Sequence, residues 1–238
     1  MGFFDFFNSW FSTNTSDYAD TGGSIGKGNS SKNKNNNSST NINNRRSRNQ
    51  YATTLDINNS TMLQQLREAK KYRTAIEQAA RRCHLPTSVI CGIGSRESHW
   101  GLALTPPHPG GRGDFSKRRP RGVRRGRIPN DGPGYGRGLM QIDYDWHEFA
   151  RTGNWQNPRA NLIKAADVLN GSRTFFQRRI QLSDKDKVQA MIAAYNAGAT
   201  ATYNCLKKRK DVDCATTGRD YSKDVLNRTG WFQLHGWK

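Results

Sequence analysis

The hydrophobic pattern predicts helices over most of the chain after residue 60. Thr61, with Gln64 three residues later, has the spacing of a capping box. An apolar stripe with helical spacing continues from there to Arg82. Its members are Met62, Leu63, Leu66, Ala69, Ile76, Ala79 and Ala80. Pro86 ends this helix and favours the first turn of the next one, which runs through Ile93.

Further helices are predicted in the second half of the chain. A helical zone starts near Asp143, and Asn157-Pro158 has the form of a helix cap followed by a first-turn proline. The remaining helices are predicted over residues 157–177, 183–194, 198–209 and 218–229. Strand signals are scarce, and only residues 135–142 suit a small hairpin. The pattern therefore predicts an α+β fold that is mainly α, with a small β element.

Residues 1–60 differ from the rest of the chain. Residues 22–59 consist largely of Asn, Ser, Thr and Gly, which offer too little apolar surface to offset the entropy of ordering. We therefore expect a disordered tail over residues 1–60 and one folded domain over residues 61–238. Within that domain, residues 105–137 form a long interruption rich in Gly, Pro and Arg.

The first dozen residues form an aromatic amphipathic segment. On a helical wheel, one side carries Phe3, Phe4, Phe6, Phe7, Trp10 and Phe11. The segment makes a poor signal peptide, because it lacks a basic start and contains Asp5 and Asn8. It suits a helix that docks on a membrane surface or on a partner, or a terminus that packs on the domain. The chain has no run of about 18 apolar residues, so an ordinary transmembrane helix is excluded.

The formal net charge of +19 favours an anionic partner. Residues 1–60 contain six basic and four acidic residues, so most of this charge belongs to the domain. Eight basic residues lie from Arg112 to Arg127, where Asp114 is the single acidic residue. This basic loop is interpreted as an electrostatic clamp for anionic cell-wall polymers or a membrane surface, with a solvated insertion as the alternative. It has few stacking aromatics, so we expect no specific nucleic-acid partner.

Four cysteines allow three disulfide pairings. Cys205 and Cys214 bracket a short charged loop, which favours a disulfide between them and would imply an oxidising compartment. Four reduced thiols are the alternative. The spacing of these two residues with Cys83 and Cys91 does not fit a zinc ribbon, and no histidine motif for zinc is present. We therefore expect no bound metal and no other cofactor.

Glu97 is the first candidate for catalysis. Together with Ile90 and Ile93 it follows the spacing of one helix face, so its carboxyl group continues an apolar surface. An apolar environment disfavours the ionised form and raises the pKa of a carboxyl group. A group of this kind is suited to act as a general acid at mild pH. The alternative is a glutamate at a helix end that reaches water or pairs with a neighbouring arginine.

Two further stretches contain candidate cleft residues. The first, residues 136–143, reads Gly-Arg-Gly-Leu-Met-Gln-Ile-Asp, and its glycines permit close approach of another backbone. Its alternation predicts Gln141 and Asp143 along a hairpin edge beside a cleft. The second, residues 194–198, reads Ala-Tyr-Asn-Ala-Gly and ends a helix with Gly198 as its C-cap. Taken singly, an ordinary Gly-rich turn and a core tyrosine explain these stretches equally well.

Together the three stretches resemble the goose-type lysozymes. Glu-Ser-His at 97–99 precedes the Gly-Leu-Met-Gln-Ile-Asp and Ala-Tyr-Asn-Ala-Gly motifs, in the order of that family, and the similarity continues through 216–221 and 233–236. It covers about residues 62–238. Two of these motifs also occur in lytic transglycosylases of the same superfamily. The resemblance implies a lysozyme-like fold in which the small β element lies beside the substrate cleft.

The resemblance also implies roles for individual residues. Glu97 corresponds to the family's general acid, and Asp143 corresponds to a carboxylate proposed to position the attacking water. Other positions that correspond to cleft residues of the family are His147, Tyr195, Asn196 and Tyr221. The family inverts the anomeric centre, which requires two carboxyl groups about 6.5–9.5 Å apart with a water between them.

The stretch 105–137 departs from the family pattern. Goose-type enzymes have a shorter connection there, with a second candidate aspartate. Asp131 matches that aspartate if one residue is skipped before Gly138, and Asp114 is a weaker match. The sequence therefore assigns the general acid more firmly than it assigns the group that activates the water.

A muramidase is the leading hypothesis for function. It would be a monomer that cleaves the β-1,4 bond between N-acetylmuramic acid and N-acetylglucosamine in bacterial peptidoglycan. A lytic transglycosylase would use a single glutamate and leave 1,6-anhydro ends, and the presence of Asp143 favours the hydrolase over it. A non-catalytic cationic protein that binds walls or membranes is a third hypothesis. Because the enzyme must meet its substrate, we expect it to be secreted or held in a vesicle or vacuole, although no clear signal peptide precedes the domain.

Overall fold

A computed structural model of the 238-residue chain describes residues 51–118 and 128–238. The predicted aromatic helix and most of the predicted tail lie outside the described residues, as do residues 119–127 of the basic loop. Within the described part, no helix combines the length and the apolar character needed to cross a membrane.

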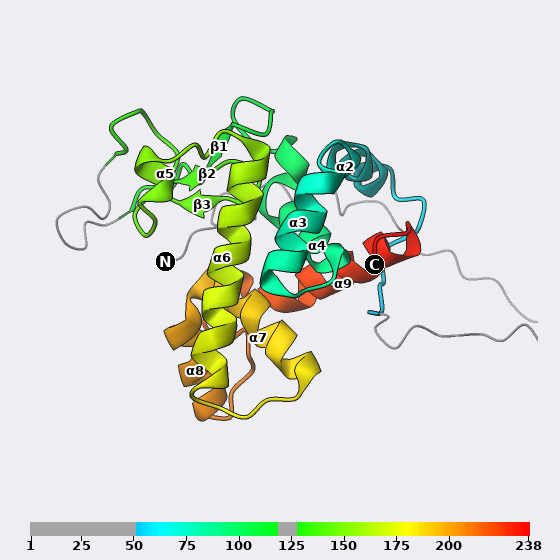
Figure 1. The fold of residues 1–238 in the computed structure, drawn as a ribbon, viewed down its shortest axis with the longest axis vertical. Coiled ribbons are helices and arrows are strands. Elements are labelled where there is room, and N and C mark those ends of the chain that lie inside the picture. The colour runs from blue at the N-terminus through cyan, green and yellow to red at the C-terminus, as the bar shows by residue number, and fades with distance from the viewer. Residues whose placement is uncertain (1–50, 119–127) are drawn as a thin grey trace, which may run out of the picture.

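The described part is mainly helical and contains one small sheet (Figure 1). Its α-helices are α2 (Ser60–Lys71), α3 (Arg73–Cys83), α4 (Thr87–Ser98), α5 (Phe149–Thr152), α6 (Pro158–Gln177), α7 (Asp184–Ala197), α8 (Ala199–Lys207) and α9 (Tyr221–Leu234). A short 3-10 turn at His99–Gly101 follows α4, and another at Thr217–Arg219 precedes α9. The antiparallel sheet has the order β1 (Arg112–Gly113), β2 (Gly136–Arg137) and β3 (Ile142–Asp143). The predicted α+β, mainly α, fold class is confirmed.

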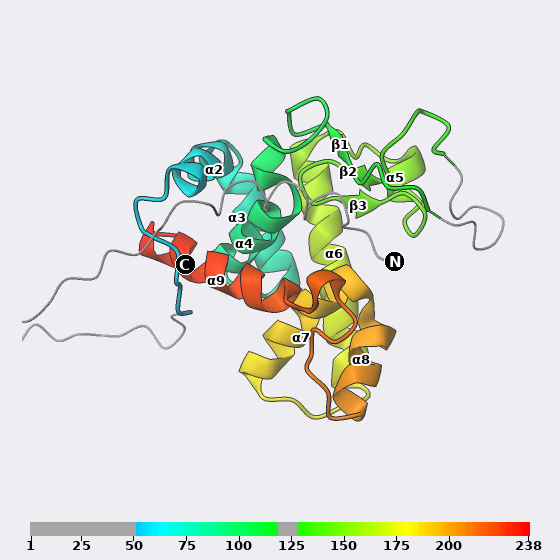
Figure 2. The same cartoon turned by 180° about the vertical axis from the view of Figure 1, so that it is seen from behind.

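Helix α4 lies in the core of the fold. It packs against α9 and α3, and α3 packs in turn against α6. Seen from behind, α9 runs across α4 (Figure 2). Gly92 permits this close packing, because a Cβ there would lie 2.6 Å from the Thr229 hydroxyl. With Val89, Ile90 and Ile93 fully buried, the last turn of α4 is held firmly in place.

The single helix predicted over 61–82 is in fact two helices, α2 and α3. Tyr72 separates them with a non-helical φ of −111°, and its ring stacks on Trp100 with 6.3 Å between centroids. The helix start also differs, since Asn59, not Thr61, is the N-cap and accepts a hydrogen bond from the Met62 N–H at 2.9 Å. The prediction was wrong because no Gly or Pro marks the break, which tertiary packing imposes.

Residues 51–59 pack on the domain, although their composition places them in the predicted tail. The Tyr51 N–H donates to the side chain of Gln233 at 2.8 Å, and the indole of Trp231 donates to the carbonyl of Asp56 at 2.7 Å. These bonds attach the segment to α9 through main-chain groups. Composition carries no signal for main-chain contacts, so it placed residues 51–59 in the tail although they pack on the domain.

The region around Asp143 is a strand and not the start of a helical zone. Asp143 ends β3, and α5 begins only at Phe149. The hairpin predicted over 135–142 is confirmed as β2 and β3, with Arg137 opposite Ile142. Strand β1, which comes from the insertion, was not predicted. Its addition to the sheet places Gly113 opposite Gly136 of β2, which pairs on its other side with Asp143 of β3.

The disulfide expected between Cys205 and Cys214 is present. It links the end of α8 to the loop that leads to α9. Cys83 and Cys91 are buried free thiols. The second half of the chain is thus cross-linked close to the start of α9.

Replacing Cys205 and Cys214 together by serine is expected to destabilise the domain. The bond joins residues nine apart, and opening a loop of this size costs about 3 kcal/mol in the chain-entropy account. Urea unfolding should show a lower midpoint for the double variant. Reduction with dithiothreitol should lower the wild-type midpoint equally and leave the variant unchanged. Equal midpoints for oxidised wild type and variant would contradict a stabilising role.

Candidate active site

Glu97 lies in the last turn of α4 with its side chain buried, at 2% exposure. Burial raises the pKa of its carboxyl group from the usual 4.5 to about 8, against smaller lowering effects of Tyr221 and Arg96. The Tyr221 hydroxyl donates a hydrogen bond to Oε1. Oε2 has no hydrogen-bond partner among the described residues. The predicted apolar environment is confirmed, and the group holds its proton at neutral pH.

Two tyrosines lie beside Glu97, the fully buried Tyr221 and the half-buried Tyr195. Tyr221 begins α9, and Tyr195 lies in the last turn of α7, where its hydroxyl donates to the carbonyl of Met140 at 2.7 Å. Burial raises the pKa of both phenols, and the charge of Glu97 raises it further. Both hydroxyls therefore remain donors over the working pH range. Helices α4, α7 and α9 thus converge on one carboxyl group.

Arg96 does not pair with Glu97, although it is the neighbouring residue. Its guanidinium donates to Asp224 at 2.9 Å and lies 3.6 Å from Asp220. It also lies 5.9 Å from the ring centroid of Tyr221. Because these aspartates engage Arg96, the carboxyl group of Glu97 has no cationic partner within residues 51–118 and 128–238, and its burial dominates its pKa.

The turn between β2 and β3 is fastened to the end of α4 and to α6. The Ser98 hydroxyl donates to the carbonyl of Leu139 at 2.7 Å, and the side chain of Asn161 accepts from the Met140 N–H at 2.8 Å. Gly138 is required here, since its φ is +68° and a Cβ would lie 2.5 Å from the Asn161 amide. These bonds fix β3, and with it Asp143, relative to Glu97.

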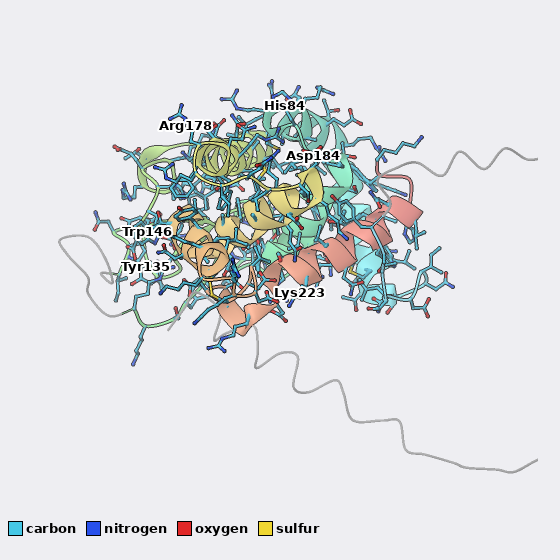
Figure 3. The ribbon with its side chains drawn as sticks, turned by 90° about the horizontal axis from the view of Figure 1, so that it is seen from below. His84, Tyr135, Trp146, Arg178, Asp184 and Lys223 are labelled. Atoms are coloured by element: carbon cyan, nitrogen blue, oxygen red, sulfur yellow. A yellow bond between two sulfur atoms is a disulfide. The ribbon has the colours of Figure 1, made fainter. Side chains whose placement is uncertain are left out.

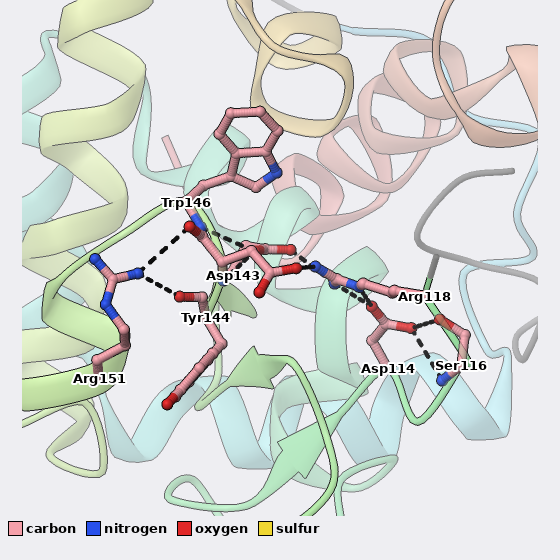
Figure 4. A network of polar contacts seen from close by, with 8 residues as sticks. Asp114, Ser116, Arg118, Asp143, Tyr144, Trp146 and Arg151 are labelled. Carbon is pink, nitrogen blue, oxygen red and sulfur yellow. Dashed lines mark hydrogen bonds and ion pairs between the residues drawn. The ribbon is translucent and has the colours of Figure 1, made fainter. Parts of the chain in front are cut away.

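Three carboxylates surround the guanidinium of Arg118 (Figure 4). Arg118 donates to Asp114 from Nε at 3.2 Å, to Asp143 from Nη2 at 2.7 Å and to Asp145 from Nη1 at 2.9 Å. The side chains of Asp114 and Asp145 are 2% and 3% exposed, and that of Asp143 is 13% exposed. The guanidinium also lies 4.0 Å from the ring centroid of Tyr135.

Asp143 is held from both sides. Its Oδ1 accepts hydrogen bonds from the backbone N–H groups of Asp145 at 2.7 Å and Trp146 at 3.2 Å. The indole of Trp146 projects away from the carboxylates in Figure 4. Trp146 and Tyr135 lie on the same side of the molecule when it is viewed from below (Figure 3). Across residues 51–118 and 128–238, no three His, Cys, Asp or Glu residues are grouped as a metal site would require.

The chain is similar in sequence to known lysozymes. A family model described as "Lysozyme g" matches residues 120–236. "Lysozyme G" of Dromaius novaehollandiae is 30% identical over 173 residues, which are 72% of this chain and 71% of that protein. "Lysozyme g" of Takifugu rubripes is 30% identical over 169 residues, 69% of this chain and 75% of that protein. The chain belongs to the lysozyme g family.

The family model does not reach α4, which precedes the matched residues 120–236. The alignments with the lysozyme g proteins extend further, as does the one with Gallus gallus "Lysozyme g", 30% identical over 168 residues and 70% of this chain. The goose-type resemblance inferred from the motifs is thereby confirmed.

Asp131 lies among arginines. It accepts from Arg137 at 2.7 Å and from Arg112 at 3.2 Å, and its side chain is 45% exposed. Arg137 is fully buried between the rings of Tyr144 and Trp155, each 5.0 Å from its guanidinium. Asp131 is the counter-ion of this buried cation and closes the base of the insertion. Its contacts do not bring it to the carboxylates around Arg118.

His147 and Asn196 lie near the site. The backbone N–H of His147 donates to the carbonyl of Asp143 at 3.0 Å. Burial is the main cause that lowers the pKa of the His147 imidazole. The side-chain oxygen of Asn196 accepts from the Thr217 N–H at 3.0 Å. Its buried Nδ2 has no partner among the described residues. The Nδ2 group of Asn196 is therefore a donor that no described residue engages.

Gln141 points into the sheet and not along its edge. It is 4% exposed, and its Nε2 donates to the carbonyl of Gly138 at 2.8 Å. Its Oε1 would lie 2.2 Å from a Cβ at Gly113 and 2.0 Å from one at Gly136. Glycines at these positions therefore make room for the amide, which supports the turn that carries Asp143.

The sequence patterns did not indicate two residues that contact each other beside Asp143, Arg118 and Asp145. Arg118 follows Asp114 by four residues, a spacing that allows an ion pair. It is one of eight basic residues in that stretch, however, and nothing in the pattern distinguishes it. Asp145 lies two residues after Asp143 and beyond the end of β3, so strand alternation does not mark it.

Proposed function

We propose that this member of the lysozyme g family is a muramidase. It hydrolyses the β-1,4 bond between N-acetylmuramic acid and N-acetylglucosamine in bacterial peptidoglycan. The observation that carries the proposal is the buried carboxyl group of Glu97, whose pKa is raised to about 8. At neutral pH this group is protonated and is able to act as a general acid. The names of the curated relatives support the same activity.

In the proposed step, Glu97 protonates the glycosidic oxygen while the bond from this oxygen to C1 of N-acetylmuramic acid breaks. A water adds to C1 from the opposite face and gives its proton to a carboxylate, which inverts the anomeric centre. The products are one sugar with a new reducing end and one with a new hydroxyl at C4. Glu97 is left ionised and recovers a proton from solvent.

The hydrogen bond of Tyr221 selects the oxygen of Glu97 that gives the proton. Because the phenol donates to Oε1, the neutral carboxyl group places its proton on Oε2. Oε2 has no hydrogen-bond partner among the described residues. We therefore assign Oε2 as the atom that protonates the glycosidic oxygen, with Tyr221 and Tyr195 as the walls that orient it.

We assign the water side of the reaction to Asp143 together with Asp114. Both carboxylates contact the same guanidinium, and both lie at the end of a strand of the small sheet. Asp131, the alternative suggested by alignment, is occupied by Arg112 and Arg137. His147, Asn196, Gln141 and the two tyrosines remain proposed contributors to the cleft, with Gln141 acting through the turn.

The proposal is tested by mass spectrometry of the fragments released from purified peptidoglycan. A muramidase gives fragments with hydrated reducing ends. Fragments lighter by one water, with 1,6-anhydro ends, would overturn the proposal and indicate a lytic transglycosylase. Wall binding without any fragments would leave a cationic binding protein. The variants Asp143→Asn and Asp131→Asn form a matched pair, and only the former is expected to abolish fragment release.

Replacing Tyr221 by phenylalanine is expected to move the alkaline limb of the pH–rate profile to higher pH. The hydroxyl stabilises the ionised form of Glu97 and so lowers its pKa. Without it the carboxyl group keeps its proton to higher pH, and activity persists there. Initial rates on a soluble peptidoglycan oligomer across the alkaline range test this. A limb that stays in place would mean that Glu97 does not set it.

The setting of the reaction follows from its substrate. We propose that the enzyme is secreted or acts in a vesicle or vacuole, since it must meet bacterial walls and contains a disulfide. The net charge of +19 suits anionic wall polymers and membrane surfaces. Residues 1–50 and 119–127, which carry the aromatic segment and much of the basic loop, remain the proposed contacts to them.

A further inference from the structure

The cluster around Arg118 holds more negative charge than the hydrolysis requires. Asp114, Asp143 and Asp145 all contact a single guanidinium, at 2.7 and 2.9 Å for the latter two. Two of the three carboxylates are almost fully buried. Like charges this close disfavour ionisation of one another, and an opposite charge at their centre favours it.

The guanidinium fits this position in a way that a lysine would not. Its Nε and Nη2 reach Asp114, Nη2 also reaches Asp143, and Nη1 reaches Asp145. A planar group with several donors holds three acceptors in a fixed arrangement, whereas an ammonium is a point charge. The face of the guanidinium lies 4.0 Å from the centroid of the Tyr135 ring, which fixes its plane.

We infer that Arg118 is a positioning residue for the water-activating carboxylates, supplied by the insertion that distinguishes this chain from the family pattern. It holds Asp114 and Asp143 in register with each other, so that one of them orients the attacking water and accepts its proton. Arg118 itself touches neither substrate nor water in this role. The inference rests on the muramidase proposal and adds to it a residue that neither the motifs nor the family resemblance assigns.

The test compares Arg118→Met with Arg118→Lys and with Lys117→Met. Lys117 is the exposed neighbour, so its replacement makes the same change in charge outside the cluster. For Arg118→Met we expect kcat to fall about 100-fold, the size of effect that a misplaced catalytic group produces, with little change in KM. Arg118→Lys should lose less, and Lys117→Met should keep the wild-type kcat, with any effect of its lost charge on wall binding confined to KM.

Two readouts separate positioning from a merely structural role. The first is the split between the two kinetic constants, because misplaced carboxylates should lower kcat in Arg118→Met and leave KM close to the wild-type value. The second is chemical rescue. For Arg118→Ala, added guanidinium ions at non-denaturing concentration should restore part of the lost kcat.

Several outcomes would overturn the inference. Wild-type kcat in Arg118→Met would do so, as would a loss confined to KM. A rise in kcat would also do so, since Arg118 would then block the site. If Arg118→Met fails to fold, Arg118→Lys with the guanidinium rescue decides. Failure of the muramidase proposal looks different, because wild type itself would then release no fragments with hydrated ends.

Discussion

Glu97→Gln is expected to abolish peptidoglycan cleavage while leaving the fold intact. Loss of a general acid lowers the rate about 10²–10⁴-fold. We expect the fall in kcat to lie at the upper end of that range, because Glu97 is the single proton donor in the proposed step. Glutamine has the same size and keeps an oxygen for the hydrogen bond from Tyr221. Release of reducing ends from purified peptidoglycan is the measurement.

The matched control is Glu77→Gln, a glutamate on the surface of α3 whose side chain is 38% exposed. This variant makes the same chemical change at an exposed position, and its activity should equal that of wild type. Binding to walls, measured by co-sedimentation, should survive in both variants because the net charge is large and positive. Cleavage by Glu97→Gln at the wild-type rate would remove Glu97 from the mechanism.

The same substitution is expected to stabilise the protein in a pH-dependent manner. The pKa of Glu97 is about 8 in the folded state and near 4.5 when the chain is unfolded. A raised folded-state pKa contributes stability that is fully present below about pH 4.5 and is lost as pH rises through about 8. Glutamine does not titrate. Relative to wild type, the variant should therefore gain roughly 3 kcal/mol between pH 4.5 and neutral pH.

Guanidinium chloride unfolding at a series of pH values measures this difference. Comparing each variant with wild type at the same pH cancels the other titrating groups, and Glu77→Gln again serves as the control. The free energy of unfolding of Glu97→Gln minus that of wild type should grow with pH and level off above pH 8. A difference independent of pH would mean that the carboxyl group is ionised in the folded protein.

The sequence allowed the acid side of the site to be predicted, since the environment of Glu97 follows from local spacing. Ile90, Ile93 and Glu97 share one face of α4, and all three side chains are buried. The disulfide from Cys205 to Cys214 was equally local. Features that depend on periodicity or short spacing are encoded within a few turns, so one sequence is enough to find them.

The water side could not be predicted in the same way. Whether Asp114 or Asp131 lies near Asp143 depends on how the insertion folds back and adds β1 to the sheet. Alignment with the family favoured Asp131, but the buried guanidinium of Arg137 requires a counter-ion and holds that carboxylate. Arg118 was hidden for the same reason, because long-range electrostatic pairing leaves no periodic signal.

The other incorrect predictions have a related cause. The break at Tyr72 and the packing of residues 51–59 on α9 depend on contacts with Trp100 and Trp231, which are distant in sequence. Neither segment has the Gly, Pro or apolar pattern that would mark it. Tertiary packing overrode local propensity in the first case and composition in the second.

The central claim is that Glu97 holds a proton at neutral pH, and carboxyl carbon NMR tests it without any substrate. Labelling glutamate at the side-chain carboxyl carbon and comparing wild type with Glu97→Gln identifies the resonance of Glu97 by its absence in the variant. The account predicts that this resonance titrates near pH 8. A midpoint near 4.5, the usual value for a glutamate, would show an ionised Glu97 and contradict its assignment as the acid.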